Sequence, residues 1–563
     1  KALEGERGML PKKQHLLPPL SNNIKCGNSL IGYDILDAPL LSLRATPFSS
    51  LRAEGEAISD ETKSRINPFD WNSKSVGFGE IMNPSQSPLE KGGSKGGFDV
   101  VIGNPPYIRI QTMKEWAPDE VAHYKQHYVS ASKGNYDIYV IFVEKGLSLL
   151  NPKGRFGFIL PHKFFQTQYG EPLRGIISKG KHLSHVVHFG HQQVFEGAST
   201  YTCLLFLNRE GGKECFFEKV DNLKDWLNKG SSIVGKIAAT KIKEAEWNFT
   251  VGENSGLFER MTKIPTRLRD IADIFVGLQT DADDVYILEE KQISGDRVLC
   301  YSKATEQNHW FEDNHLKLFV KGSLNVKRYE LANVSKRLIF PYKLVDGKSQ
   351  LIDSHDYSKS FPLTWAYLEE NRKRLSLRNK GNVARSEWYG YIYKKNHSRL
   401  ATPKLLVPSI GTGSCFAADL KGDYYFVGSG GGGGGGYGIS LPPASNVSYL
   451  YLLGLLNSAL ISAYLKTIST PFRGGYIAMN RQYIEQLPIR TIDFKNPSEK
   501  TIHDKLVSLV DRMLELHKKK NSLLPSAERE KIEREISITD EKIDDMVYGL
   551  YGITEGERKI VEG

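Results

Sequence analysis

Between residues 98 and 209, short runs of apolar residues alternate with stretches in which apolar residues recur at helical spacing. Helical spacing over residues 136–150 and 171–178 predicts two helices. Four apolar runs predict strands: FDVVIG (98–103), RFGFILP (155–161), LSHVVHFG (183–190) and STYTCLLFLNR (199–209). Strand and helix alternate as in a doubly wound α/β sheet, so we expect residues 98–103 to form a central parallel strand that is buried on both faces.

The region before this sheet differs in character. Residues 24–32 (IKCGNSLIG) form a short strand-like run that closes in a turn. Residues 37–97 are rich in Gly, Pro, Ser and charged residues and lack periodic apolar spacing. We therefore assign residues 1–36 to a fragment of the core, residues 37–97 to an insertion or linker, and residues 98–250 to the core itself.

The pattern changes near residue 250. Over residues 251–495, short strand-like runs such as KLLVPSIG (404–411) and DYYFVG (423–428) mix with loops and one apolar helix at 449–466, which predicts a separate α+β domain. Residues 496–563 form a helical tail. Its first helix, 501–520, has an apolar face at spacings of three and four, and a second helix follows Pro525, which predicts a helical hairpin; the face comprises Ile502, Leu506, Leu509, Met513 and Leu516.

Composition narrows the class of protein. The 75 Lys and Arg residues exceed the 65 Asp and Glu residues and give a net charge of +10, which favours a polyanionic partner. The five cysteines form no C-x-x-C pair, which argues against a disulfide framework and a zinc cluster and fits a reducing cytoplasm. We expect no metal site, and the sequence has no apolar run long enough to cross a membrane.

The segment Asn104-Pro105-Pro106-Tyr107 directly follows the apolar run FDVVIG. The exocyclic amine of adenine is a poor nucleophile, and it needs acceptors for its N–H bonds before it can attack a methyl sulfonium. The side-chain oxygen of Asn104 and the backbone carbonyl of Pro105 can supply two acceptors, which the prolines hold in place. Tyr107 offers a flat face for a base that has left the duplex. The segment thus predicts a pocket for a planar amine at the carboxyl end of a strand.

Residues 98–209 resemble the TaqI-like adenine-N6 class of amino-methyltransferases through GFDVVIGNPPYIR, NYDIYVIFVEKGLSLLNPKGRFGFILP and VFEGASTYTCLLFLNR. The resemblance implies a Rossmann-like methyltransferase sheet in which residues 104–107 are the catalytic motif. It implies that Phe195 stacks on the flipped adenine. It also implies that Phe142 touches the cofactor or substrate side and that Asn28, in CGNSL (26–30), meets S-adenosylmethionine. Core packing for Phe142 and Phe195 and a turn role for Asn28 are the alternatives.

Residues beyond 250 resemble the TaqI-like C-terminal specificity domain, which reads double-stranded DNA, and the helical tail resembles that of type IIG restriction–modification enzymes. Arg473 and Arg481 are the candidate DNA contacts. The family's Gly-rich cofactor loop would lie upstream of residue 24. We therefore expect a missing N-terminal half of the same polypeptide to be a partner of this chain, and we expect this fragment alone to be inactive. No nuclease cluster is found in the sequence.

Three other functions stay open at this point. The same tetrapeptide positions any planar amine or amide, so an RNA-adenine or a protein-glutamine methyltransferase is one pair of alternatives. A DNA-binding specificity module without catalytic activity is the third.

Overall fold

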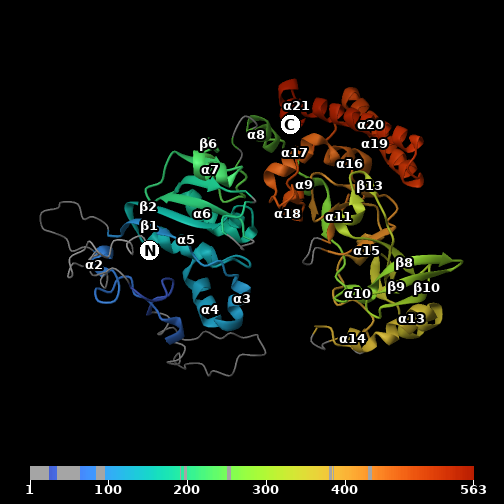
Figure 1. Ribbon diagram of the computed structural model, residues 1–563, viewed down its shortest axis with the longest axis horizontal. Coiled ribbons are helices and arrows are strands. Elements are labelled where there is room, and N and C mark those ends of the chain that lie inside the picture. The colour runs from blue at the N-terminus through green and yellow to red at the C-terminus, as the bar shows by residue number, and fades with distance from the viewer. Residues whose placement is uncertain are drawn as a thin grey trace, which may run out of the picture. The chain divides into compact units, whose positions relative to one another are not determined.

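The computed structural model describes residues 25–33, 64–83, 96–190, 192–195, 200–249, 251, 255–379, 383–384, 386–428 and 434–562. The chain divides into two compact units, Lys1–Gly252 and Glu253–Gly563. Each unit has its own hydrophobic core and is mixed α/β (Figure 1).

The first unit is built on a six-stranded sheet with the order β1-β2-β4-β3-β5-β6. Strands β1 and β2 are parallel, and β4 runs antiparallel to both of its neighbours, β2 and β3. The strands are β1 (Phe98–Gly103), β2 (Leu150–Pro161), β3 (Leu183–His188), β4 (Thr202–Asn208), β5 (Glu214–Lys219) and β6 (Ile233–Ala238). The helices are α2 (Gly79–Met82), α3 (Ile110–Trp116), α4 (Pro118–His127), α5 (Tyr139–Ser148), α6 (Glu171–Lys179) and α7 (Leu223–Lys229). The four strands and two helices expected from the apolar pattern are confirmed.

The expectation that residues 98–103 are a central strand buried on both faces is wrong for the described structure. Strand β1 lies at the edge of the sheet, and Val100 and Ile102 are 60% and 82% exposed. The opposite face is covered, because a Cβ added at Gly146 of α5 would lie 3.4 Å from Val101. The apolar run therefore has one packed face, whereas Val100 and Ile102 are exposed on the other.

Two parts of the chain before β1 also differ from expectation. The run at 24–32 is not a strand: in its described part, 25–32, Asn28 forms a single parallel bridge with Pro68. The supposed linker contains packed residues, since Trp71 and Phe78 make edge contacts with Phe98 at ring-centroid distances of 6.0 and 5.4 Å. Part of residues 37–97 thus belongs to the core of the first unit, although residues 37–63 and 84–95 lie outside the described ranges.

The second unit contains a six-stranded sheet, β10-β9-β8-β14-β11-β20, and a four-stranded sheet, β19-β17-β21-β7. The strands of the larger sheet are β8 (Ile287–Ser294), β9 (Arg297–Ser302), β10 (Gln307–Glu312), β11 (Leu316–Val320), β14 (Lys336–Ile339) and β20 (Tyr424–Phe426). The smaller sheet comprises β7 (Asp273–Val276), β17 (Lys404–Pro408), β19 (Ala417–Asp419) and β21 (Gly436–Ser440). Among the described residues of this unit there are also three two-stranded pairs: β12 (Val326–Lys327) with β13 (Glu330–Leu331), β15 (Tyr342–Val345) with β16 (Lys348–Leu351), and β18 (Ile410–Gly411) with β22 (Ile477–Ala478).

Helices cover and connect these sheets. They are α8 (Ser255–Thr262), α9 (Leu268–Ile271), α10 (Asp283–Tyr286), α11 (Gly322–Asn325), α12 (Ser354–Ser360), α13 (Pro362–Glu370), α14 (Arg372–Ser376), α15 (His397–Leu400), α16 (Tyr449–Asn457), α17 (Ala459–Ile468), α18 (Arg481–Ile484), α19 (Pro497–Ser522), α20 (Ala527–Tyr551) and α21 (Glu555–Glu562). In the tail, α19 and α20 pack on one another, and Leu506, Met513 and Leu516 of the expected apolar face are buried.

The single apolar helix expected at 449–466 is two helices, α16 and α17, which meet at an angle of 65°. The break has a local cause. The Asn457 amide pairs with both backbone groups of Phe416, at 3.0 and 2.9 Å, and the Ser458 side chain caps α17 by accepting from Ile461 N. These polar bonds end one helix and start the next, which an apolar pattern alone does not reveal.

Candidate active site and DNA-contact residues

Three candidate segments leave the sheet of the first unit at the same edge. Strand β1 is parallel to β2, and β3 has the same direction because both β2 and β3 are antiparallel to β4. Asn104 follows β1, His162 follows β2, and the segment that carries Phe195 follows β3. The topology therefore places the candidate catalytic motif and the candidate stacking residue at the carboxyl ends of parallel strands, where α/β sheets bind ligands.

The catalytic motif combines a fixed ring with an accessible amide. Pro105 is buried, while Asn104 and Pro106 are exposed. The Tyr107 hydroxyl donates to the Ile159 carbonyl of β2 at 3.0 Å, which ties the motif to the neighbouring strand. Burial raises the pKa of Tyr107 to about 12, so the hydroxyl stays protonated and keeps donating at neutral pH.

Tyr107 contacts a network formed by Tyr139, Tyr169 and Asp137. The Tyr107 ring meets Tyr139 edge-on, with ring centroids 6.3 Å apart and planes at 83°. The hydroxyls of Tyr139 and Tyr169 lie 3.1 Å apart, and Tyr169 donates to Asp137 Oδ2 at 3.5 Å. Burial raises the pKa of Asp137, while Lys163 and Arg109 act in the opposite direction. Sequence reasoning missed this network, although Asp137, Tyr139 and Tyr169 were visible as polar or aromatic residues close to predicted helices.

Two histidines, the buried His162 and the half-buried His188, hold the turn after β3. The rings of His162 and His188 lie 4.3 Å apart between centroids. His162 Nε2 lies 3.3 Å from the Gly190 carbonyl, and Gly190 N donates to His188 Nδ1 at 3.1 Å. Gly190 has a positive φ of 57°, which favours glycine at this turn.

The segment that carries Phe195 is fixed by Gln192. Its side-chain amide donates to the Val220 carbonyl at 2.7 Å and accepts from Leu223 N at the start of α7. Phe195 itself is 36% exposed, so its ring is accessible at the end of a held segment.

These two histidines make the stability of the first unit depend on pH. Burial lowers the pKa of His162 from 6.5 to about 4, and the pKa of His188 is lowered in the same direction. When the pH lies between the folded and the unfolded pKa of His162, the unfolded chain binds a proton that the folded protein excludes. The stabilisation that the neutral histidine provides is therefore complete above the unfolded pKa and is lost as the pH falls.

We expect the free energy of unfolding of the first unit to fall by about 2 kcal/mol between about pH 7 and about pH 5 through His162 alone. Urea denaturation at several pH values, followed by hydrogen exchange in β2 and β3, measures this. His162→Gln retains a donor toward Gly190 and should flatten the pH dependence. An equally steep dependence in the variant would show that His162 is not responsible.

The two candidate cofactor residues are both engaged within the protein. The Asn28 amide donates to Glu120 Oε2 at 3.2 Å, and its oxygen accepts from Leu30 N at 3.1 Å. The buried Glu120 also pairs with Arg65 at 2.7 Å. Phe142 is half-buried and packs against the core of the first unit. These contacts are those of a turn asparagine and a core aromatic.

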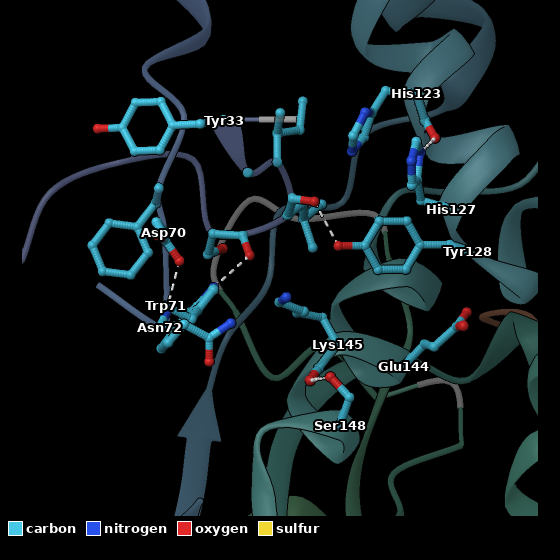
Figure 2. Close-up of a pocket in the computed structure, with 15 residues that line it drawn as sticks. Tyr33, Asp70, Trp71, Asn72, His123, His127, Tyr128, Glu144, Lys145 and Ser148 are labelled. Atoms are coloured by element: carbon cyan, nitrogen blue, oxygen red, sulfur yellow. Dashed lines mark hydrogen bonds between the residues drawn. The ribbon is translucent and has the colours of Figure 1, made fainter. Parts of the chain in front are cut away.

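A cavity of about 560 Å³ lies beside the Asn28 segment (Figure 2). The labelled residues Asp70, Trp71 and Asn72 line one side, and His123, His127 and Tyr128 line another. Trp71 also contacts Phe98, the first residue of β1, whereas Asn104 follows the last residue of that strand. The cavity therefore lies toward the start of β1 and is separate from the candidate catalytic motif.

The two candidate DNA-contact arginines differ in their surroundings. Arg481 is paired with Glu485 at 3.1 Å, one turn further along the chain. Arg473 is exposed, and in the described part of the chain it has no carboxylate partner. Arg473 is thus the better placed of the two to bind an anionic group.

Comparison with known proteins links these sites to two families. Residues 21–195 match the model for the Eco57I restriction-modification methylase, and residues 317–489 match the TaqI-like C-terminal specificity domain. The chain is 27% identical to the type II restriction enzyme and methyltransferase RM.Eco57I of Escherichia coli over all of its own length and 52% of that relative. It is 25% identical to the type II methyltransferase M.PaeR7I of Pseudomonas aeruginosa, over 73% of this chain and 67% of the relative.

A solved structure extends the likeness to the fold. The type IIL restriction-modification enzyme MmeI in complex with DNA matches with a TM-score of 0.51 and 13% identity, over 82% of this chain and 56% of that protein. This chain therefore spans about half the length of RM.Eco57I and of MmeI. In the described ranges no single helix is long and apolar enough to cross a membrane, although the bent pair α16 and α17 meets the criterion jointly.

Proposed function

We propose that this chain is part of a type IIG restriction–modification protein. Its residues 21–195 match the Eco57I restriction-modification methylases, and its residues 317–489 match the TaqI-like specificity domains. It would transfer a methyl group from S-adenosylmethionine to adenine N6 at a specific site in double-stranded DNA. The observation that carries this proposal is the accessible Asn104 beside a fixed Tyr107 at the carboxyl end of a strand.

The residues of the motif would activate the amine of a flipped adenine. The Asn104 side-chain oxygen and the Pro105 carbonyl accept from the two N–H bonds, which directs the nitrogen lone pair away from the ring. Tyr107 and Phe195 hold the two faces of the base by stacking. S-adenosylmethionine supplies the methyl group as an electrophilic sulfonium.

Among the described residues, the candidates for binding the cofactor, Asn28 and Phe142, can form only part of a binding site. Phe142 can present its exposed edge to the adenine of S-adenosylmethionine. The Asn28 side-chain oxygen accepts from Leu30 N, and its second lone pair can accept from the amino group of that adenine, while the amide nitrogen stays bonded to Glu120. The fit is therefore partial, and we propose that the remaining contacts come from the segment that covers β1.

We propose that the partner on β1 is the N-terminal half of the same parent polypeptide. In the described structure β1 has hydrogen-bonded neighbours on one side only, and its Val100 and Ile102 form an exposed apolar face. Doubly wound sheets are covered on both faces, and an open edge strand accepts another strand through its backbone groups. A further parallel strand with a helix above it would bury both residues.

Ile102→Asp tests this partner. A carboxylate at this position would be buried without a counter-charge, so the affinity for the separately expressed upstream half should fall at least about tenfold. Titration of one labelled half with the other measures it. Val234→Asp is the matched control, because Val234 is 55% exposed on β6 at the opposite edge of the same sheet. Equal affinities for both variants would exclude β1 as the docking strand.

The reaction is tested with the chain and its upstream half together. The pair is incubated with labelled S-adenosylmethionine and duplex DNA, RNA or protein, and the labelled product is hydrolysed and identified. N6-methyladenine in DNA is the expected product. Label in RNA or on protein glutamine would support those alternatives instead, and sequence-specific DNA binding without any label would leave a non-catalytic specificity module.

A further inference from the structure

Residues 470–478 form a tight hairpin in the second unit. Ala478 N donates to the Thr470 carbonyl at 2.9 Å, and Phe472 N donates to the Tyr476 carbonyl at 2.6 Å. The turn is made by Gly474 and Gly475, whose φ angles are +81° and +77°. Only glycine adopts this conformation readily, so the two glycines form a sharp turn at the tip of the hairpin. Arg473 precedes this turn and Tyr476 follows it.

The base of this hairpin is firmly attached. Strand β22, at Ile477 and Ala478, pairs with β18, and Met479 N donates to the Ser409 carbonyl at 2.9 Å. Ile477, Ala478 and Met479 are 5%, 2% and 0% exposed. The tip is therefore held on the core of the unit by buried residues.

The tip itself points away from that core. Arg473 is exposed without a carboxylate partner among the described residues, and the Tyr476 ring is 44% exposed. A Cβ added at Gly474 would lie 3.6 Å from the Tyr476 ring, so the ring lies beside the turn. An exposed guanidinium and an exposed aromatic ring on the same narrow, fixed tip match a ligand with negative charges and flat apolar faces. Nucleic acid has both, as phosphates and base faces.

We infer that this hairpin tip is a DNA-binding element in which Arg473 binds a backbone phosphate and Tyr476 stacks on a base face. In a closed duplex the base faces are covered by their neighbours. Once a target adenine leaves the stack, the adjoining bases are uncovered, and an aromatic side chain at a narrow tip can replace the lost stacking. The inference rests on the proposed base-flipping reaction and names a residue, Tyr476, that would stabilise the opened DNA.

The test uses the whole chain and two short duplexes of the same sequence, one intact and one with an abasic tetrahydrofuran residue in place of one adenine. We expect wild-type protein to bind the abasic duplex more tightly. Tyr476→Ala should lose about tenfold in affinity for the abasic duplex, within the range for stacking on one base, and little for the intact duplex. Tyr476→Phe keeps the ring and should retain the preference.

Arg473→Ala separates the two contacts. It should weaken binding to both duplexes equally and reduce the slope of log affinity against log salt by about one. If Tyr476→Ala binds the abasic duplex as wild type does, or if wild type shows no preference, the hairpin inference fails while DNA methylation still stands. If the chain binds neither duplex, DNA as the substrate fails as well. If Tyr476→Ala keeps its DNA binding but loses binding to a protein, the tip contacts a protein partner and the inference is overturned.

Discussion

Asn104→Ala will lower the rate of methyl transfer to DNA by about two to three orders of magnitude, the usual cost of removing one fixed polar group that stabilises a transition state. The amine becomes nucleophilic only when an acceptor draws its N–H bond out of the plane of the ring, and alanine offers none. Single-turnover transfer of labelled methyl, with the proposed upstream half supplied, measures the rate of this step.

The loss should not come from unfolding, because the Asn104 side chain is exposed. Asn228→Ala, at an exposed position of α7 in the same unit, is the matched control and should leave the rate unchanged. Asn104→Asp retains an oxygen acceptor and should keep more activity than the alanine variant. A full rate in Asn104→Ala would show that the side chain is not an acceptor in the reaction.

Asp419→Ala will destabilise the second unit by about 3–5 kcal/mol, the cost of removing one partner of a buried ion pair. Lys404 and Asp419 are 0% and 1% exposed, and their charged atoms lie 2.5 Å apart. Without the carboxylate, the ammonium would be buried with backbone carbonyls such as that of Leu400, at 2.6 Å, as its partners. Urea unfolding of the whole chain, followed by a probe in β17, measures the loss.

Lys404→Met should cost less than Asp419→Ala. The remaining carboxylate still accepts from three backbone N–H groups, those of Gly422, Asp423 and Tyr424, at 2.9–3.0 Å. Asp423→Ala is the control, since its side chain is exposed and such changes usually lie within about 0.5 kcal/mol. Equal losses for Lys404→Met and Asp419→Ala would mean that the backbone donors do not stabilise the carboxylate.

The sequence by itself determined the elements whose pattern is local. The second half of β2, RFGFILP, and the β4 run are mainly apolar, and the α19 face repeats every three or four residues, so each was predicted before any contact was known. It also placed Asn104 and Tyr107 after a strand, since the tetrapeptide and the apolar run are contiguous. Local composition and spacing are sufficient for such statements because they depend on neighbours within a few residues.

Tertiary structure alone decided which faces are buried and which polar groups meet. The run at β1 reads as a buried strand, yet Ile102 is 82% exposed, because burial depends on what packs there and not on the run itself. The contacts of Tyr107 with Ile159, and of His162 with His188, join residues that are far apart in the chain. No local pattern encodes these pairs; the common direction of β1, β2 and β3 brings their carboxyl ends to one edge of the sheet, where the candidate site residues lie.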